Sequence, residues 1–335
     1  MITAIAAIAV FLTVILVHEF GHFAVAKLVG IEVNEFSIGM GPKILQRKKG
    51  ETEYTLRILP IGGYVKMEGE DESSDNPRSF NNAKPLSKIG VLAAGAIMNF
   101  ILAIITLTIV SYGMGVPTTT VNIMEGLPAE ESGMISGDKI ISINNNPITD
   151  WNSIAENIND TDPNKDIEVE VKRKNKNKTF FIKTTVEDGR NIIGIKPVVE
   201  KSLLGAIKGG LQNTGMFLGA MFEFISMLFK GQVGINGLAG PVGVIKEVGV
   251  FAKQGIYDLL FFLGFISINL GFLNLLPIPA LDGSRIAFLL VELVRGKPVN
   301  PEKEGFVHFL GFIFLISLML IVTYKDIIGL NLFNK

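Results

Sequence analysis

The amino-acid sequence predicts a polytopic α-helical membrane protein with about four transmembrane helices and a smaller strand-rich insert. Nearly half of the 335 residues are hydrophobic, and they gather in long runs. A helix rises about 1.5 Å per residue, so roughly 20 apolar residues cross a hydrocarbon core about 30 Å thick. Five stretches approach that length: 1–28, 89–112, 203–229, 259–276 and 306–324.

The composition excludes several other classes of protein. Acidic and basic residues nearly balance, 32 against 31, and cysteine is absent. Without a basic excess to neutralise phosphates, no nucleic acid is expected as a partner. Without cysteine, disulfides and thiolate chemistry are excluded, so any metal must be bound by His, Asp or Glu.

The first apolar stretch is expected to form a transmembrane helix over 1–30. It has neither the basic start nor the small-residue cleavage site of a signal peptide. His18, Glu19 and His22 interrupt it. Two histidines four residues apart share one face of a helix and can bind one cation, with the glutamate offset toward a water on that cation.

Two histidines packed between helices are the alternative to a metal site. An ionisable group near the bilayer centre costs about 2.5 to 3.5 kcal/mol even on a lenient insertion scale. Three such groups in five residues need a compensating partner, and a divalent cation supplies one. The sequence therefore favours a zinc site of the kind that catalyses hydrolysis.

The basic residues predict how the chain crosses the membrane. The segment 31–87 is rich in Lys and Arg and is expected in the cytoplasm, which places the N-terminus outside. A second helix over 88–113 returns outward, so 115–200 is extracytoplasmic, and the basic loop 284–305 is cytoplasmic again. The basic residues between the first two helices are Lys43, Arg47, Lys48, Lys49, Arg57, Lys66, Arg78, Lys84 and Lys88.

This orientation decides the role of the stretch 203–229. A full crossing there would leave the basic loop 284–305 on the wrong side. With Lys208 and Glu223 in it, the stretch is expected to lie at the outer interface, within an amphipathic segment 201–255. The remaining helices are predicted at 256–283 and 306–324, before a tail at 325–335.

The insert 115–200 shows the alternation of half-buried strands in DIEVEVKRK and KTFFIKTTV, joined by a polar turn NKNK. DWNSIAENI predicts a short helix with Asp150 as its N-cap. GLPAEESGMISGDKIISINNNPI resembles bacterial PDZ domains, which bind peptides at a sheet edge. That resemblance implies a peptide groove along IIGIKPV, at Ile193, Gly194 and Ile195. A β-rich spacer without specific affinity is the alternative.

A third metal ligand must come from elsewhere at a similar depth, because catalytic zinc usually has three protein ligands. His18 follows about 17 apolar residues, which puts it roughly 25 Å into the membrane. Asp282 follows a comparable apolar length in NLGFLNLLPIPALDG. Pro277 and Pro279 break the helix before it and let the carboxylate approach the metal. A loop carboxylate facing cytoplasmic water is the alternative.

Two further polar residues, His308 and Asn274, could also belong to the site. His308 is a rival ligand, but inside FVHFLGF a packed interfacial histidine is favoured. Asn274 precedes the prolines and is the best candidate donor for an oxyanion. An interhelical hydrogen bond is an equally weighted role for Asn274.

The combination of HEFGH, AAGAIMNF, a PDZ-like insert and NLLPIPALDG resembles the site-2 protease family of intramembrane zinc metalloproteases, nearest to its bacterial regulator-of-sigma-E branch with a single PDZ domain. The resemblance implies one zinc ion held by His18, His22 and Asp282, with Glu19 as general base. It also implies a bacterial cytoplasmic membrane location, an active site toward the cytoplasm, and substrates that are single-pass membrane proteins such as anti-sigma factors or remnant signal peptides.

The same family has a membrane-associated β-region that FSIGMGPKI, TLRILPIGGYVKM and PRSFNNAKPLSKIG resemble. A helical substrate must be extended before water can attack it, and a strand edge could pair with it. An ordinary cytoplasmic hairpin is the alternative. The substrate-binding residues expected here are Gly62, Gly63, Tyr64, Val65, Lys66, Pro277 and Pro279.

The chain departs from the family pattern at Ser284 and Arg285, where many relatives continue with glycine and histidine, and at Ala96, where proline is common. None is a proposed ligand, so the departures bear on positioning near Asp282. A catalytically silent metal-binding scaffold with a PDZ domain is the competing function. Metal transport would need more polar residues across the membrane.

Overall fold

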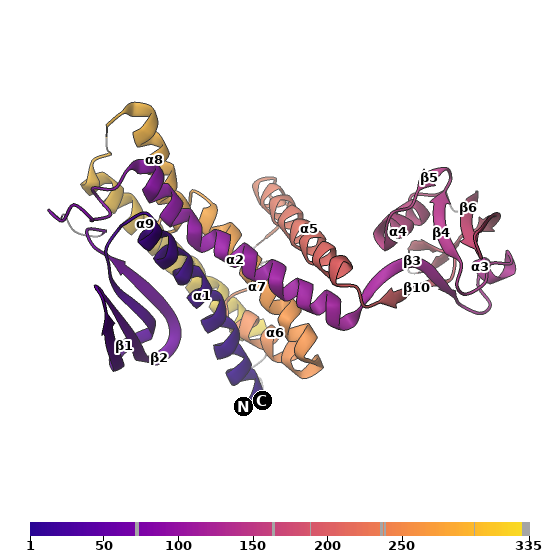
Figure 1. The fold of residues 1–335 in the computed structure, drawn as a ribbon, viewed down its shortest axis with the longest axis horizontal. Coiled ribbons are helices and arrows are strands. Elements are labelled where there is room, and N and C mark those ends of the chain that lie inside the picture. The colour runs from indigo at the N-terminus through magenta and orange to yellow at the C-terminus, as the bar shows by residue number, and fades with distance from the viewer. Residues whose placement is uncertain are drawn as a thin grey trace. The chain divides into compact units, whose positions relative to one another are not determined.

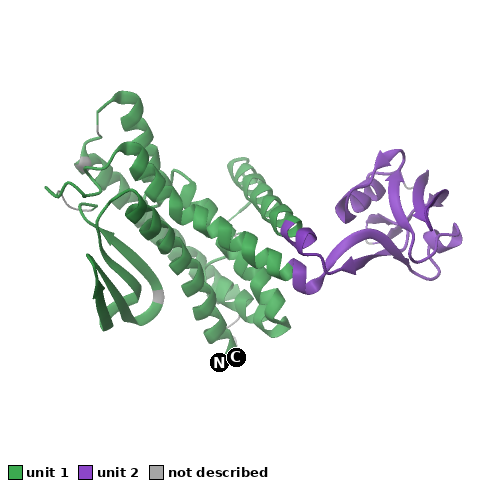
Figure 2. Ribbon diagram, in the orientation of Figure 1, with its two compact units in different colours: residues 1–110, 208–335 green, residues 111–207 purple. Residues whose placement is uncertain are grey.

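The structure is a computed structural model that describes residues 1–70, 74–162, 165–187, 189–234, 237, 239–297 and 299–329, with only the backbone described for Ile61 and Pro301. The chain forms two compact units (Figure 2). The first contains residues 1–110 and 208–335, and the second contains residues 111–207.

Long apolar helices dominate the first unit (Figure 1). Four described helices are long and apolar enough to cross a membrane. The stretch expected at the interface forms helix α5 (Leu203–Phe229), which is not among the four. The four are α1 (Ile2–Leu28), α2 (Pro85–Met114), α7 (Ile256–Leu275) and α9 (Pro301–Gly329, with its apolar span at Glu302–Gly329).

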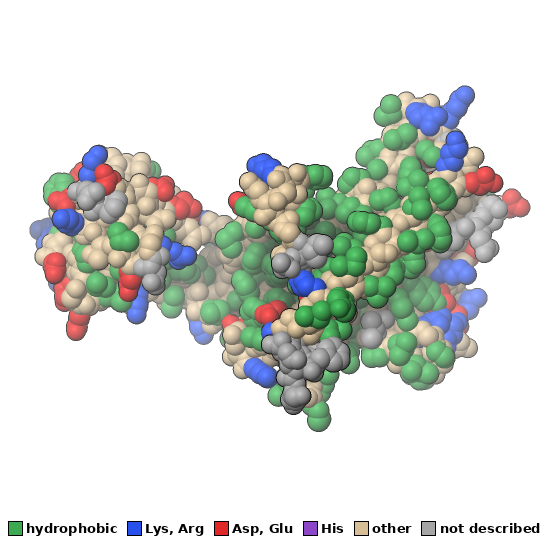
Figure 3. Space-filling model, turned by 180° about the vertical axis from the view of Figure 1, so that it is seen from behind, with side chains coloured by type: hydrophobic (Ala, Val, Ile, Leu, Met, Phe, Trp, Pro, Cys, Tyr) green, Lys and Arg blue, Asp and Glu red, His purple; other side chains and the backbone are tan. Residues whose placement is uncertain are grey.

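The outward faces of these helices are apolar as well. Ile5, Ile101, Ile105 and Phe312 are all exposed, and hydrophobic side chains cover much of the face in Figure 3. A soluble monomer rarely exposes contiguous apolar patches larger than a few hundred Å². The first unit is therefore that of a membrane protein.

One stripe of α1 is buried, and it leads to the predicted site. Val10, Val14, His18 and His22 recur every four residues along it. The α2 helix packs against this stripe in antiparallel fashion, and the two backbones come close at Gly21. A Cβ atom there would lie 2.3 Å from the Ala94 carbonyl oxygen, so only glycine permits this approach.

A sheet of two bent strands follows α1. Strands β1 (Val33–Lys49) and β2 (Thr52–Met67) are long and bent. As a result, residues 33–38 of β1 pair with two separate segments of β2. The resulting order of segments is 43–49, 52–57, 33–38 and 63–67. The segment 63–67 is thus an edge of this sheet in the described part of the chain.

The C-terminal part differs from the sequence prediction in two places. The helix predicted over 256–283 ends at Leu275, before Pro277. The segment 284–305, predicted as a loop, contains helix α8 (Asp282–Arg295). Its basic residues suggested a loop, but Ile286, Leu289 and Leu293 recur at helical spacing and line one face.

The start of helix α6 is tied to helix α9 by a buried carboxylate. Helix α6 (Pro241–Gln254) precedes α7. Asp326 of α9 accepts hydrogen bonds at its Oδ2 atom from the backbone amides of Gly240 and Gly243, at 2.9 and 2.8 Å. A carboxylate there satisfies free amides at the start of α6 and ties α9 to it.

The second unit is a small mixed α/β domain. Its main sheet has the strand order β10-β3-β4-β6-β7, with β5 beside β4, and a separate pair joins β8 and β9. The elements are β3 (Val116–Ile123), α3 (Pro128–Glu131), β4 (Lys139–Ile143), β5 (Asn146–Pro147), α4 (Trp151–Asn159), β6 (Asp166–Arg173), β7 (Lys176–Lys183), β8 (Thr185–Glu187), β9 (Arg190–Ile192) and β10 (Ile195–Glu200).

Two local predictions in this unit can be compared with the structure. Asp150 caps α4, accepting a hydrogen bond from the Ser153 amide at 3.0 Å as predicted. The polar turn is at Lys174 and Asn175, both with positive φ, rather than over all of NKNK. Strand β7 already begins at Lys176, which pairs with Arg173 of β6 across the turn.

Candidate metal centre

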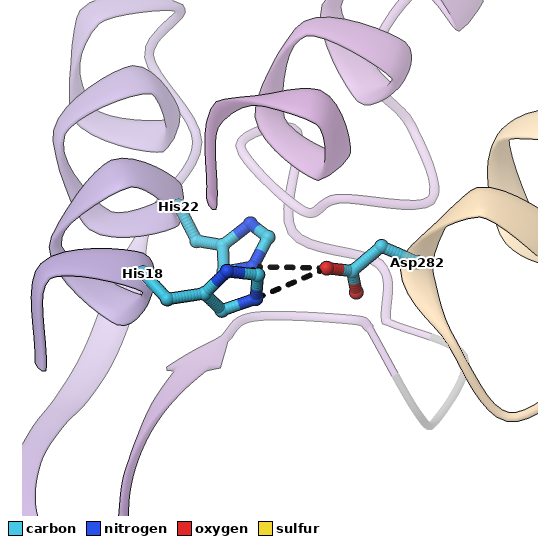
Figure 4. Close-up of side chains that lie close together, drawn as sticks. All are labelled: His18, His22 and Asp282. Carbon is cyan, nitrogen blue, oxygen red and sulfur yellow. Dashed lines mark hydrogen bonds and ion pairs between the residues drawn. The ribbon is translucent and has the colours of Figure 1, made fainter. Parts of the chain in front are cut away.

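Three predicted ligands converge in the first unit (Figure 4). The His18 Nε2 atom lies 3.1 Å from Asp282 Oδ2, and the His22 Nε2 atom lies 3.4 Å from it. The two Nε2 atoms are 3.1 Å apart. Both histidines are buried, and Asp282 is half-buried. Side chains from near the start and near the end of the chain thus meet at one point.

The connection 276–281 brings Asp282 to this point. Pro277 follows the end of α7, and Ala280 adopts a left-handed backbone with φ of 76°. Asp282 then opens α8, where the helix dipole favours a carboxylate. Gly283 allows α8 to begin against the end of α7, since a Cβ atom there would lie 2.3 Å from the Leu276 carbonyl oxygen.

The three donors fit a zinc ion. At about 2.0 to 2.2 Å from a tetrahedral zinc, donor atoms lie about 3.3 to 3.6 Å apart, close to the observed spacings. The Nδ1 atom of His22 lies 2.8 Å from the Val91 carbonyl oxygen. Nδ1 must donate this bond, so a neutral His22 directs a lone pair from Nε2 at a carboxylate oxygen. Acceptors that converge in this way need a cation between them.

Helix α2 forms the wall behind both imidazoles. A Cβ atom on Gly95 would lie 2.5 Å from His22 Nε2 and 2.6 Å from His18 Cε1. Asn99, fully buried, places its amide nitrogen 3.3 Å from His18 Nδ1. Sequence reasoning noted the AAGAIMNF motif and assigned no role to these two residues. Their spacing of four, which matches that of the histidines, was the available signal.

The side chain of Glu19, on α1, lies beside the edge of β2. The backbone of Val65 contacts the Glu19 carboxyl group. At Gly63 the strand passes so close to α1 that a Cβ atom would lie 3.3 Å from Leu16 Cδ2 and 3.8 Å from Glu19 Cγ. The predicted general base and the predicted strand edge are therefore neighbours.

The rest of the GGYVK segment is held by the sheet. Gly62 has a φ of 82°, a conformation that favours glycine. The Tyr64 hydroxyl accepts a hydrogen bond from Arg57 Nη2 at 2.6 Å. Lys66 pairs with Glu35 in the register of the sheet.

The other predicted residues lie around the cluster or apart from it. His308 is not in the cluster, because its Nδ1 atom accepts a hydrogen bond from the Ala280 amide at 3.1 Å. Asn274 is buried near the end of α7. Its oxyanion role stays a prediction. Pro279 packs tightly against α9, where a Cβ atom on Gly311 would lie 2.2 Å from Pro279 Cβ.

The predicted peptide groove lies wholly in the second unit. Ile193, Gly194 and Ile195 line a cavity of about 550 Å³ together with residues of α4. Gly194 has a φ of 81°, and a Cβ atom on it would lie 2.2 Å from Leu127 Cβ. A peptide-binding role for this cavity stays a prediction.

A bundle of apolar helices around a buried His-His-Asp cluster, with a glutamate beside it, defines a membrane-bound metal-dependent hydrolase. The model of peptidase family M50 matches residues 6–318. The chain belongs to this family, whose members are the site-2 type zinc metalloproteases, and it is a zinc metalloprotease.

Three similar proteins come from species of Clostridium and Bacillus. A Clostridium acetobutylicum protein, provisionally named a zinc metalloprotease, is 39% identical over 96% of each chain. The regulator of sigma-W protease RasP of Bacillus subtilis is 35% identical over 97% of this chain and 98% of its own. The zinc metalloprotease RasP of Bacillus licheniformis is 33% identical over the same shares.

Proposed function

We propose that the protein hydrolyses peptide bonds within or near the transmembrane segment of single-pass membrane proteins. The observation that carries this proposal is the convergence of His18, His22 and Asp282 inside a bundle of membrane-length helices, with Glu19 beside them. A hydrolytic site surrounded by apolar helices is accessible to substrates that share the membrane.

We assign His18, His22 and Asp282 as the ligands of one zinc ion. Two imidazoles and one carboxylate form the donor set of many catalytic zinc sites and leave a fourth position free. When bound, zinc supplies Lewis-acid activation of water and of the scissile carbonyl.

Glu19 is the general acid and base. As a carboxylate it takes the proton from the attacking water, and it then returns this proton to the leaving amine. Its position on α1 next to His18, and the contact of its carboxyl group with the Val65 backbone, support this role. Asn274 is the candidate donor to the oxyanion.

The edge of β2 extends the substrate. A helical substrate hides its carbonyls in its own hydrogen bonds, and pairing with the free edge at 63–67 would hold it open beside Glu19. The left-handed Gly62 sets the start of this edge. The proposed substrate-binding residues are Gly62, Gly63, Tyr64, Val65 and Lys66, together with Pro277 and Pro279 in the connection before Asp282.

The name of one relative bears on the class of substrate. One of them is named a regulator of sigma-W protease, which supports an anti-sigma factor as one substrate. Remnant signal peptides are a second class. We place the protein in the bacterial cytoplasmic membrane, with the N-terminus and the PDZ-like unit outside and the active site toward the cytoplasm.

The test is the substitution Glu19→Gln in the full chain, co-expressed with a tagged single-span substrate. The variant should keep its zinc and lose cleavage by at least about 100-fold, because general base catalysis contributes about 10² to 10⁴. Cleavage at the wild-type rate would remove Glu19 from its role. Zinc analysis of Asp282→Ala completes the test, since unchanged zinc content would place the third ligand elsewhere.

A silent scaffold with a structural metal is the competing function. A structural zinc site closes its fourth position with another protein ligand, whereas the described residues offer three. Membership of a peptidase family also favours the enzyme.

A further inference from the structure

The Nδ1 atoms of the two imidazoles have different neighbours. His22 Nδ1 faces a hydrogen-bond acceptor, whereas His18 Nδ1 faces an amide nitrogen. His22 Nδ1 lies 2.8 Å from the Val91 carbonyl oxygen, an acceptor that fixes the proton on Nδ1 and leaves Nε2 free. At His18 the corresponding neighbour is Asn99, whose amide nitrogen is drawn 3.3 Å from Nδ1. An amide nitrogen only donates, so this orientation would require a lone pair on His18 Nδ1.

That orientation conflicts with zinc binding. If Nδ1 of a neutral His18 carries a lone pair, Nε2 carries the proton and cannot bind a metal. The Oδ1 atom of Asn99 is meanwhile buried without a hydrogen-bond partner among the described residues. A buried acceptor without a partner costs about 1 to 3 kcal/mol.

A half-turn of the amide group resolves the conflict at His18. The oxygen and nitrogen of an asparagine amide exchange places on this rotation and have nearly the same shape. Oδ1 then faces His18 Nδ1, accepts its proton and leaves Nε2 free, as the Val91 carbonyl does for His22. Both rings then have an acceptor on α2 behind them, the Val91 carbonyl for His22 and the Asn99 side chain for His18.

We infer that Asn99 is a positioning residue that accepts the Nδ1 proton of His18 through Oδ1 and holds His18 in the form that binds zinc through Nε2. The inference rests on the proposed ligand set. Asn99 itself is held in place, because the Ser267 hydroxyl of α7 donates to its backbone carbonyl oxygen at 2.8 Å. Three helices thus determine the protonation of one ring.

Zinc affinity of the full-length protein in detergent provides the first test. Partners of ligating histidines typically contribute 10- to 100-fold to metal affinity. Asn99→Leu, similar in volume but unable to accept, should weaken zinc binding by that factor in a chelator competition. Asn99→Asp, which offers an acceptor in either orientation, should stay within about threefold of the wild type or bind more tightly.

Asn269→Leu is the matched control. Asn269 is another asparagine in a membrane-length helix, half-buried rather than fully buried, and its amide donates to the Phe265 carbonyl of its own helix. It should leave zinc affinity unchanged. Unchanged or increased affinity in Asn99→Leu would overturn the inference, as would equal losses in the Leu and Asp variants, which would indicate a packing role.

Nuclear magnetic resonance of the imidazole N–H groups is the second test, with the chain's three histidines labelled with ¹⁵N and the zinc site loaded. The His18 Nδ1 proton should be shifted downfield and slow to exchange in the wild type and in Asn99→Asp. It should lose both properties in Asn99→Leu, whereas the His22 Nδ1 proton keeps them in every variant. An identical His18 signal in Asn99→Leu would contradict the inference.

The two proposals can fail separately. If His18→Ala leaves zinc affinity unchanged, the proposed ligand set is wrong. If His18→Ala abolishes binding and Asn99→Leu does not weaken it, the ligand set holds and the role of Asn99 is wrong.

Discussion

At the scale of single residues, the site depends on the absence of a side chain at Gly95 as well as on the side chains of the cluster. Gly95 has no side chain at the point where α2 passes both imidazoles, and any Cβ atom there would overlap them. The two rings are in turn close to each other, with centroids 4.7 Å apart. The positions of the two imidazoles are therefore fixed by contact on more than one side.

Gly95→Ala should weaken zinc binding at least about tenfold, because the new methyl group must displace His18, His22 or the α2 backbone. Chelator competition on the purified protein measures the effect. Gly90→Ala on the same helix is the control, since its Cβ atom would meet only Val25 Cγ1 at 3.9 Å. Equal affinities for the two variants would contradict the crowding at Gly95.

The residues that could be predicted from the sequence are those whose chemistry is rare in their surroundings. Two histidines and a glutamate stand out in an apolar run, and Asp282 is the single carboxylate near the broken helix. The Val91 carbonyl, Gly95 and Asn99 could not be found in this way. Gly95 and Asn99 share the four-residue spacing of the histidines, but the sequence does not show that α2 faces α1 at these positions. A backbone carbonyl has no sequence signal at all.

At the scale of elements, helix α9 supports the connection that carries Asp282. His308 accepts a hydrogen bond from Ala280, the residue in the left-handed conformation, and Gly311 lets α9 pack against Pro279. A left-handed backbone costs a residue other than glycine about 1 to 2 kcal/mol. The contacts from α9 help to hold this strained connection in place.

His308→Leu should lower zinc affinity about fivefold, because a hydrogen bond contributes about 1 kcal/mol and this one holds the segment leading to Asp282. His308→Asn offers an acceptor near the position of Nδ1 and should retain most of the affinity. The comparison of the two variants by zinc titration isolates the acceptor. Equal affinities in wild type and His308→Leu would show that α9 does not position Asp282.

Element boundaries were the less predictable part of the fold. The membrane helices followed from length and hydropathy, and the β-region from the resemblance to the family. Helix α8 was not predicted, because the basic residues of 284–305 favoured a loop. The double pairing of β1 and β2 was hidden because a bend in a strand comes from bulges, which alternation alone does not reveal.

At the scale of the whole molecule, the two units have different kinds of core. The core of the second unit is a cluster of mainly Ile and Val side chains from one face of α4 and from the sheet. It also contains a buried carboxylate, Asp138, that accepts hydrogen bonds from Arg173 Nε and Nη2, both at 2.7 Å. The stability of this unit should therefore depend on pH in its own way.

Burial raises the pKa of Asp138, but the Arg173 pair and the Ile135 amide outweigh burial and hold that pKa below its usual value. The stabilisation is fully present above the unfolded-state pKa of about 3.9 and is lost as the pH falls through the lower folded-state value. Asp138→Asn should destabilise the unit by about 3 kcal/mol at pH 7. The difference from wild type should shrink below about pH 4.

Fluorescence of the single tryptophan measures this effect in the intact protein. Trp151 begins α4 and packs against the core of the second unit, so denaturant titration reports unfolding there. Asp166→Asn, at an exposed position at the start of β6, is the control. A pH-independent difference between Asp138→Asn and wild type would contradict the ion pair as its cause.

The placement of the metal cluster also has a consequence for synthesis. Two of its side chains are on α1 and the third is on α8, so most of the described chain lies between them in the sequence. A nascent or prematurely terminated polypeptide cannot complete the cluster. Translation itself therefore delays assembly of the reactive centre until the surrounding helices have been made.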